Sequence, residues 1–418
     1  MNSVPSTAAG VHGLRYTFKA VIIVFVIAFA ARFALVLLLP DFDVPIRGEM
    51  ERVAVSWAST GQLANPYSTP TGPTAHVSPL YPIILGLIYK LFGTGTSGHL
   101  VQAAFACMIS ATRCVLLLLM AVLFGLEFRT GLIAAAFSVF YITAFNTELR
   151  GSWEAPLAGL FLMALTLLAM RFSNAPAFRL RTAVAYGVFC GLGVLLSPTL
   201  APPIAAFLAA TVPLGRRDWK RFAVWLSVLS ATAFLVLVPW LIRNRRVMGS
   251  PVLRSNFGLE LSLAYNEHER AGAIDSDITN LHPILNPTVS RHVAQVGEIS
   301  FNRECERQAW SWIRKHPASA FRLFSEHVLY FWFPPATNVF LRVTLVIITV
   351  SSLLGLLQLR SRNPRAALLI GLLWLSFPLI YYVTYWSSRY RYPIEWTLLL
   401  CSVVLLDSLW QKLAPVRR

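Results

Sequence analysis

The sequence has little charge, and most of it is of one sign. Only 13% of its 418 residues are charged, about half the proportion found in soluble proteins. Acidic residues are the scarcest: 19 Asp and Glu stand against 36 Lys and Arg, for a formal net charge of +17. A nucleic-acid-binding protein would gather its basic residues on a polar surface, but here they separate long apolar runs. The composition therefore excludes a soluble globule and a nucleic-acid partner, and indicates a multi-pass membrane protein.

Cysteine and internal repeats are also lacking. Of five cysteines only Cys305 lies in a polar segment, so no disulfide framework is predicted. No period of 20 to 50 residues is visible in the sequence. This absence weighs against a transporter built from repeated units.

Ten apolar runs predict an all-α membrane protein. A spanning helix needs about 20 mostly apolar residues, and the first long run ends at Pro40 and is expected to be a retained signal anchor rather than a cleaved signal peptide. The shorter runs around Pro198 are either two short crossings or one re-entrant hairpin. The six long runs are Ala20–Leu39, Leu100–Phe124, Phe222–Leu241, Val343–Leu359, Ala366–Trp386 and Tyr392–Trp410, and the four shorter ones are Thr130–Phe145, Ala155–Met170, Thr182–Leu196 and Thr199–Leu214.

Basic clusters predict the topology, because Lys and Arg concentrate in short cytoplasmic loops. Placing five such clusters inside gives ten crossings of the cell (inner) membrane with both termini cytoplasmic. The expected units are an N-terminal membrane domain (1–241) with an outer loop at 41–99, a large outer loop (242–337) and C-terminal transmembrane helices (338–418). The clusters are Arg15 and Lys19; Arg171, Arg179 and Arg181; Arg216, Arg217, Lys220 and Arg221; Arg360, Arg362 and Arg365; and Lys412, Arg417 and Arg418.

Two interfacial helices are predicted in the first outer loop, at Glu49–Thr60 and Leu80–Phe92. On the first, Glu49 shares a polar face with Arg52, whereas Glu51 lies about 160° away. A carboxylate held against an acceptor hydroxyl can act as a general base, but an acidic face is also common on an interfacial helix. Glu49 is the favoured base.

Two further acids precede this helix. Asp41 and Asp43 form an Asp-x-Asp pair that could bind a divalent cation, or simply belong to a loop. Asp43 and Glu51 are the less favoured candidates for the base. A divalent metal is possible but not implied, and no other cofactor is indicated.

A proline-rich stretch separates the two interfacial helices, and it cannot form a regular helix. Its aromatic and hydroxyl side chains suit the wall of a sugar site, although a linker would have a similar composition. The candidate substrate-binding residues in and around the outer loops are Arg52, Tyr67, Thr74, His76, Tyr81, Arg243 and Asn256.

Basic residues near the outer interface could bind a lipid phosphate. Lys90, Arg389 and Arg391 are the candidates, since guanidinium and ammonium groups both bind phosphate; ordinary snorkelling would also explain them. Arg32 and Arg113 lie within spanning runs, where charge is costly and is a functional candidate by default, and helix-to-helix pairing is the alternative. The five histidines of the large outer loop, which include His282, lack a metal-binding spacing.

Four motifs resemble one family. They are GEMERVAVSWASTGQLANPY followed by GPTAHVSPLYP, PWLIRNRRVMGSPVLRSNFGLEL, RYRYPIE and EAPLAGLFLMAL. Together they resemble the bacterial GT-C glycosyltransferases related to protein O-mannosyltransferases and to the aminoarabinose transferase of lipid A.

The resemblance implies an enzyme that transfers a hexosyl or pentosyl group, with inversion, from a polyprenyl-phosphate-linked donor on the outer face of the membrane. The acceptor would be a lipid, a glycan or a protein. Glu49 would take the place of the catalytic acid, often Asp in relatives, while Lys90, Arg389 and Arg391 would bind the lipid phosphate. A lipid-linked glycan ligase or polymerase and a lipid-linked sugar transporter or flippase are the alternatives.

Overall fold

The computed structural model describes residues 7–38, 48–141, 145, 147–148, 153–174, 178–211, 219–268, 271, 281–336 and 338–413. Within these ranges the chain forms helices and loops, with one isolated bridge between Ala64 and Pro73 and no strand. The predicted all-α class is therefore confirmed.

Six helical stretches are long and apolar enough to cross a membrane, and each coincides with one of the six long runs predicted from the sequence. The fifth stretch passes from α-helix into a 3-10 helix, and the sixth begins with a short helical turn that contains Arg389 and Arg391. The elements are α1 (Thr7–Leu38), α4 (Thr96–Leu123), α10 (Trp219–Met248), α16 (Val339–Arg362), α17 (Pro364–Ser376) with η3 (Phe377–Tyr382), and α18 (Ser388–Arg391) with η4 (Tyr392–Ile394) and α19 (Glu395–Leu413).

Shorter apolar helices lie where the shorter runs predicted them. A helix of nine residues, such as α9, is only about 14 Å long, roughly half the thickness of the hydrocarbon layer. Neither α5 nor α9 could therefore cross the bilayer as a straight helix by itself. The shorter helices are α5 (Phe128–Val139), α7 (Ala155–Asn174), α8 (Leu180–Leu196) and α9 (Ala201–Ala209), which follows η1 (Pro198–Leu200).

A buried ion cluster joins α1 and α4 inside the membrane domain. The carboxylate of Glu148 lies 2.5 Å from Nε of Arg32 and 3.3 Å from the Arg113 guanidinium. Ser110 and Tyr392 donate further hydrogen bonds to the same carboxylate. Arg32 and Arg113 were expected either to have a function or to pair between helices. The structure shows pairing, and the shared partner, Glu148, was not singled out from the sequence.

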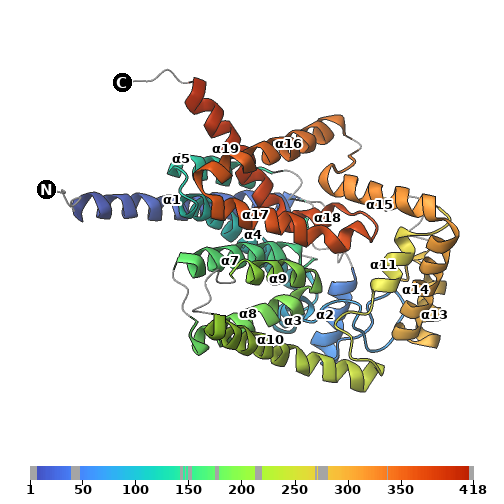
Figure 1. Cartoon of the computed structure of the whole chain (residues 1–418). Coiled ribbons are helices and arrows are strands. Elements are labelled where there is room, and N and C mark those ends of the chain that lie inside the picture. Colours follow the sequence, from blue (N-terminus) through green and yellow to red (C-terminus); the bar gives the residue numbers. More distant parts are fainter. Residues whose placement is uncertain are drawn as a thin grey trace.

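The helices of the large outer segment gather at one end of the bundle. Figure 1 shows them at the end opposite to the start of α1 and the end of α19, with α2 close to them. The predicted interfacial helices form with the predicted bounds, and the proline-rich stretch between them contains no helix. The helices at this end are α2 (Glu49–Thr60), α3 (Leu80–Phe92), α11 (Phe257–Ala264), α13 (Pro287–Val296), α14 (Glu298–Lys315) and α15 (Pro317–Trp332).

Candidate active site

The first residue of α2 supplies a nearly buried carboxylate. Glu49 is 8% exposed, and its Oε1 lies 3.4 Å from Nε2 of His282. It is the first residue of the helix, where unpaired backbone N–H groups carry partial positive charge. The helix ends at Gly61, which adopts a left-handed conformation with φ of 73°.

Glu51 has separate surroundings, as the helical wheel predicts. It accepts a hydrogen bond from the Tyr89 hydroxyl at 3.1 Å and lies 3.0 Å from Nε2 of His99. Arg52 lines the same hollow as Glu51 and donates to the Tyr67 carbonyl at 3.4 Å. The helix that places Glu49 and Arg52 on one face is present, and Arg52 also reaches the hollow that Glu51 lines.

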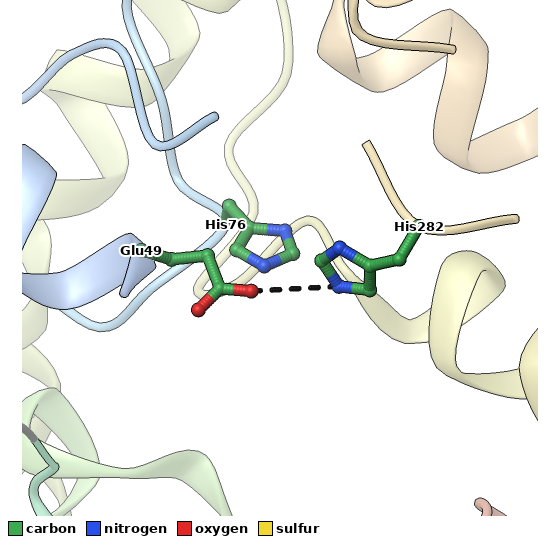
Figure 2. Close-up of side chains that lie close together, drawn as sticks. All are labelled: Glu49, His76 and His282. Carbon is green, nitrogen blue, oxygen red and sulfur yellow. Dashed lines mark ion pairs between the residues drawn. The ribbon is translucent and has the colours of Figure 1, made fainter. Parts of the chain in front are cut away.

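Two histidines lie beside Glu49. Figure 2 shows Glu49 and His282 facing each other, with the ring of His76 beside the line that joins them. One donor atom from each of the three residues lies within 4.8 Å of the others. The hydroxyl of Tyr67 lies 2.9 Å from Nδ1 of His76, which leaves Nε2 of that ring for a further partner. These side chains come from α2, the proline-rich loop and the large outer segment.

A buried acid on α14 fixes the proline-rich loop. Glu298 accepts hydrogen bonds from Thr74 Oγ1 at 2.5 Å, from the Ala75 amide at 2.8 Å and from the Ser255 hydroxyl. Burial raises the pKa of Glu298 above its ordinary value, although these three donors oppose the shift. Thr74, a predicted sugar ligand, is 1% exposed and is engaged in this contact.

A second clamp on the loop comes from α10. The guanidinium of Arg243 donates to the carbonyl oxygens of Thr74 at 2.7 Å and Leu63 at 2.6 Å. Arg243 was predicted to bind substrate; in the structure its polar contacts hold the backbone that carries His76.

A cavity of about 610 Å³ lies next to this cluster, within the usual range for a small-molecule site. Its polar wall includes two arginines and two acids, while prolines, leucine, isoleucine and aromatic rings make up much of the rest. Of the predicted site residues, Arg389 and Asn256 line it. The polar and aromatic lining residues are Trp153, Glu154, Arg254, Asn256, Glu260, Tyr381, Arg389 and Tyr390.

Glu49, His76 and His282 do not line the cavity, but one of its lining residues contacts the loop that carries His76. Arg254 donates from Nε to the His76 carbonyl at 2.7 Å, and its guanidinium lies 3.8 Å from Glu154. Arg389 lies over the ring of Trp153, 3.7 Å from the ring centre. Burial first, and then the charges of His282, Arg254 and Arg389, lower the pKa of His76 well below its ordinary value. His76 is therefore neutral at pH 7 and lies near the positive charges of Arg254 and Arg389.

Other predicted residues lie elsewhere. Lys90 is exposed on α3, and Tyr81 is buried in the hydrophobic core. Arg391 is 1% exposed and donates to the Trp332 carbonyl at 2.7 Å and to Thr349 Oγ1 at 3.1 Å. Neither Lys90 nor Arg391 is among the residues that line the cavity. Asp41 and Asp43 lie outside the described residues.

Sequence reasoning missed three residues that shape this site. His282 follows no ligand spacing, Glu298 begins an ordinary amphipathic helix, and Glu154 stood only as the first letter of a family motif. The one signal in the sequence was the scarcity of acidic residues. Because there are so few, each acid in the predicted outer segments is a candidate for a specific contact.

No known protein family matches the chain, and no curated protein is similar to it in sequence. Solved structures do resemble it. The apo oligosaccharyltransferase of Archaeoglobus fulgidus aligns with a TM-score of 0.53 at 15% identity, over 96% of this chain and 51% of that one. The same archaeal enzyme, AglB, in complex with an inhibitory peptide and a dolichol-phosphate, aligns with a TM-score of 0.50 at 14% identity, over 95% and 50%.

ArnT from Cupriavidus metallidurans bound to undecaprenyl phosphate aligns at 13% identity over 96% of this chain and 81% of that one, with a TM-score of 0.39. The chain spans about half the length of the archaeal enzyme. At such identities the likeness concerns the fold. The chain shares the polytopic all-α fold of the archaeal oligosaccharyltransferase, which is consistent with the GT-C resemblance of its motifs.

Proposed function

We propose that the protein is an integral-membrane glycosyltransferase that moves a hexose or pentose from a polyprenyl-phosphate donor to an acceptor, with inversion. The observation that carries this proposal is the electrostatic interaction of the Glu49 carboxylate with Arg389, which lines the cavity together with Arg254. In such a site Glu49 can serve as the base, and the two arginines can bind an anionic leaving group. The GT-C fold supports a membrane-embedded sugar transferase.

The donor phosphate binds between Arg254 and Arg389. Two guanidinium groups at one end of a largely apolar cavity match a phosphate attached to an isoprenoid chain. The archaeal neighbour that binds dolichol-phosphate supports a lipid phosphate as the ligand class. Trp153 offers a ring face for the sugar, and Asn256 and Glu260 offer partners for its hydroxyl groups.

In the reaction, Glu49 takes the proton of the acceptor hydroxyl as its oxygen attacks the anomeric carbon. The bond from that carbon to the phosphate oxygen breaks, and the polyprenyl phosphate leaves with the electron pair. Arg254 and Arg389 stabilise the charge that develops on the phosphate. The attack comes from the side opposite the phosphate, so the anomeric configuration inverts.

Lys90 and Arg391 have no part in this proposal, although the resemblance implied phosphate binding for both. Lys90 is exposed on α3, and the guanidinium of Arg391 is turned toward Trp332 and Thr349. Arg254 replaces them, because it lines the cavity and contacts the loop that carries His76.

The site is proposed to lie on the outer face of the inner membrane, with the N- and C-termini cytoplasmic. The basic clusters support this orientation. In this arrangement residues 242–337 form an outer unit above the membrane domain, and they contribute Arg254 and His282 to the site.

The test is transfer of radiolabelled sugar by the purified protein from polyprenyl-monophosphate donors. We expect turnover with a monophosphate donor and none with the matching diphosphate-linked oligosaccharide. Transfer from the diphosphate donor alone would instead establish the lipid-linked glycan ligase, which the likeness to an oligosaccharyltransferase favours as second candidate. Movement of the intact donor across vesicles without transfer would contradict both.

A further inference from the structure

The side chains of Glu49, His76 and His282 form a constellation that the proposed transfer reaction does not explain. One carboxylate oxygen and two imidazole nitrogens, all within 4.8 Å of one another, meet from three segments far apart in sequence. All three residues are buried, with exposures of 8%, 3% and 5%. If Glu49 acted only as a general base, it would not need two histidines beside it.

The distances suit two ligands of one metal ion better than a hydrogen bond. Oε1 of Glu49 lies 3.4 Å from Nε2 of His282, beyond the roughly 2.7–3.2 Å of an N–H···O hydrogen bond. Two ligands of a tetrahedral ion, each about 2.0–2.1 Å from it, lie about 3.4 Å apart. The ring nitrogen of His76 lies within 4.8 Å of both atoms and can supply the third corner.

The surroundings of His76 fit the same interpretation. Metal-binding histidines use one ring nitrogen for the ion and bond the other to a fixed partner. Here the Tyr67 hydroxyl lies 2.9 Å from Nδ1, which directs Nε2 toward the cluster (Figure 2). Metal binding by His282 would break one existing contact. Its Nδ1 accepts a hydrogen bond from the Ile284 amide at 3.2 Å. That contact must open when the ion binds, because Nδ1 then carries the proton.

We propose that Glu49, His76 and His282 bind one divalent transition-metal ion of the zinc class. Two imidazoles and one carboxylate are typical of such ions, whereas magnesium and calcium prefer oxygen ligands alone. Three protein ligands leave a fourth position for a water or hydroxyl oxygen, whose pKa the ion lowers. Coordination through Oε1 leaves Oε2 of Glu49 available as a base. Binding itself does not depend on the proposed transfer reaction.

The experiment uses the full-length protein purified in detergent without a polyhistidine tag, stripped with EDTA and titrated with Co²⁺. We expect one ion per chain by elemental analysis after desalting, with the intense visible absorption of tetrahedral cobalt, which Zn²⁺ abolishes. His76→Gln and His282→Gln each lose the absorption, and Tyr67→Phe weakens binding about tenfold through the outer contact.

The matched control is His292→Gln, since His292 pairs with Glu304 at 2.8 Å on the exposed side of the same outer segment. It should bind cobalt like the unmodified protein. The proposal is overturned if the unmodified protein retains no stoichiometric ion, a result that needs no variant to fold. It is also overturned if the folded His76 and His282 variants bind as tightly as the control. Both readouts need no donor, so they are independent of the transfer assay.

Discussion

Two buried glutamates differ in how fully their oxygens are used: Glu148, which pairs with α1 and α4, and Glu49, at the start of α2. Each oxygen of Glu148 accepts from two donors: Arg32 and Ser110 for one, Arg113 and Tyr392 for the other. For Glu49, within the part of the chain that the structure describes, His282 is the only paired side chain, at 3.4 Å.

We propose that this contrast separates a structural acid, Glu148, from a reactive one, Glu49. A carboxylate with four donors has no capacity left for a substrate, and its removal leaves buried guanidinium groups without a counter-charge. A carboxylate with one long contact beside a cavity can still accept a proton or hold a metal ion. Burial alone would not distinguish them, because both residues are under 9% exposed.

The largest expected effect on stability comes from the membrane cluster. Glu148→Gln removes the charge that Arg32 and Arg113 share, and breaking a buried pair in this way costs about 3–5 kcal/mol. The apparent melting temperature in detergent should fall markedly, whereas Glu49→Gln should leave it nearly unchanged. Replacing Arg32, Arg113 and Glu148 together by methionine should restore part of the loss. An unchanged melting temperature for Glu148→Gln would show that Glu148 is not the structural acid proposed here.

The second-largest expected effect is a dependence of stability on pH, which arises from a buried histidine on α15, away from the Glu148 cluster. His327 on α15 is fully buried, and burial lowers its pKa to about 4. The unfolded chain takes up a proton near pH 6.5 that the folded chain does not, so stability is lost as the pH falls from about 6.5 to about 4. Between pH 8 and pH 5 the loss should be about 2 kcal/mol.

His327→Phe serves as the matched control for this pH effect. Melting temperatures measured from pH 8 to pH 5 should fall less steeply for the variant than for the unmodified protein. Parallel curves would show that His327 is not held neutral by burial.

The smallest effect tests the cavity itself. Arg389→Lys keeps the positive charge but loses the planar group that lies over Trp153 and binds phosphate with two parallel hydrogen bonds. The KM for a polyprenyl-phosphate donor should rise about tenfold, or about 1.4 kcal/mol, with little change in kcat. Arg391→Lys, at a buried arginine outside the cavity, should alter stability and leave KM unchanged. If KM rose for Arg391→Lys and not for Arg389→Lys, Arg391 would be the residue that binds the phosphate.

Much of the fold could be predicted because the bilayer imposes length and composition on each spanning helix. The helices at Glu49–Thr60 and Leu80–Phe92 have the predicted bounds, and their period also separates Glu49 from Glu51. The partners could not be predicted. His282 and Glu148 meet Glu49 and Arg32 only through tertiary packing, and no local spacing encodes such contacts. For the same reason Arg391, beside Arg389 in the sequence, points into the interior.

Glu49 is proposed to be the reactive acid of this chain, and the decisive measurement compares the turnover of Glu49→Gln with that of Glu51→Gln. Both variants remove one charge from the same helix, and Glu51 is already engaged by Tyr89 and His99. Sugar transfer from a polyprenyl-phosphate donor should fall about 100- to 10,000-fold for Glu49→Gln, whereas Glu51→Gln should retain most of it. Near-normal turnover by folded Glu49→Gln protein would contradict the account.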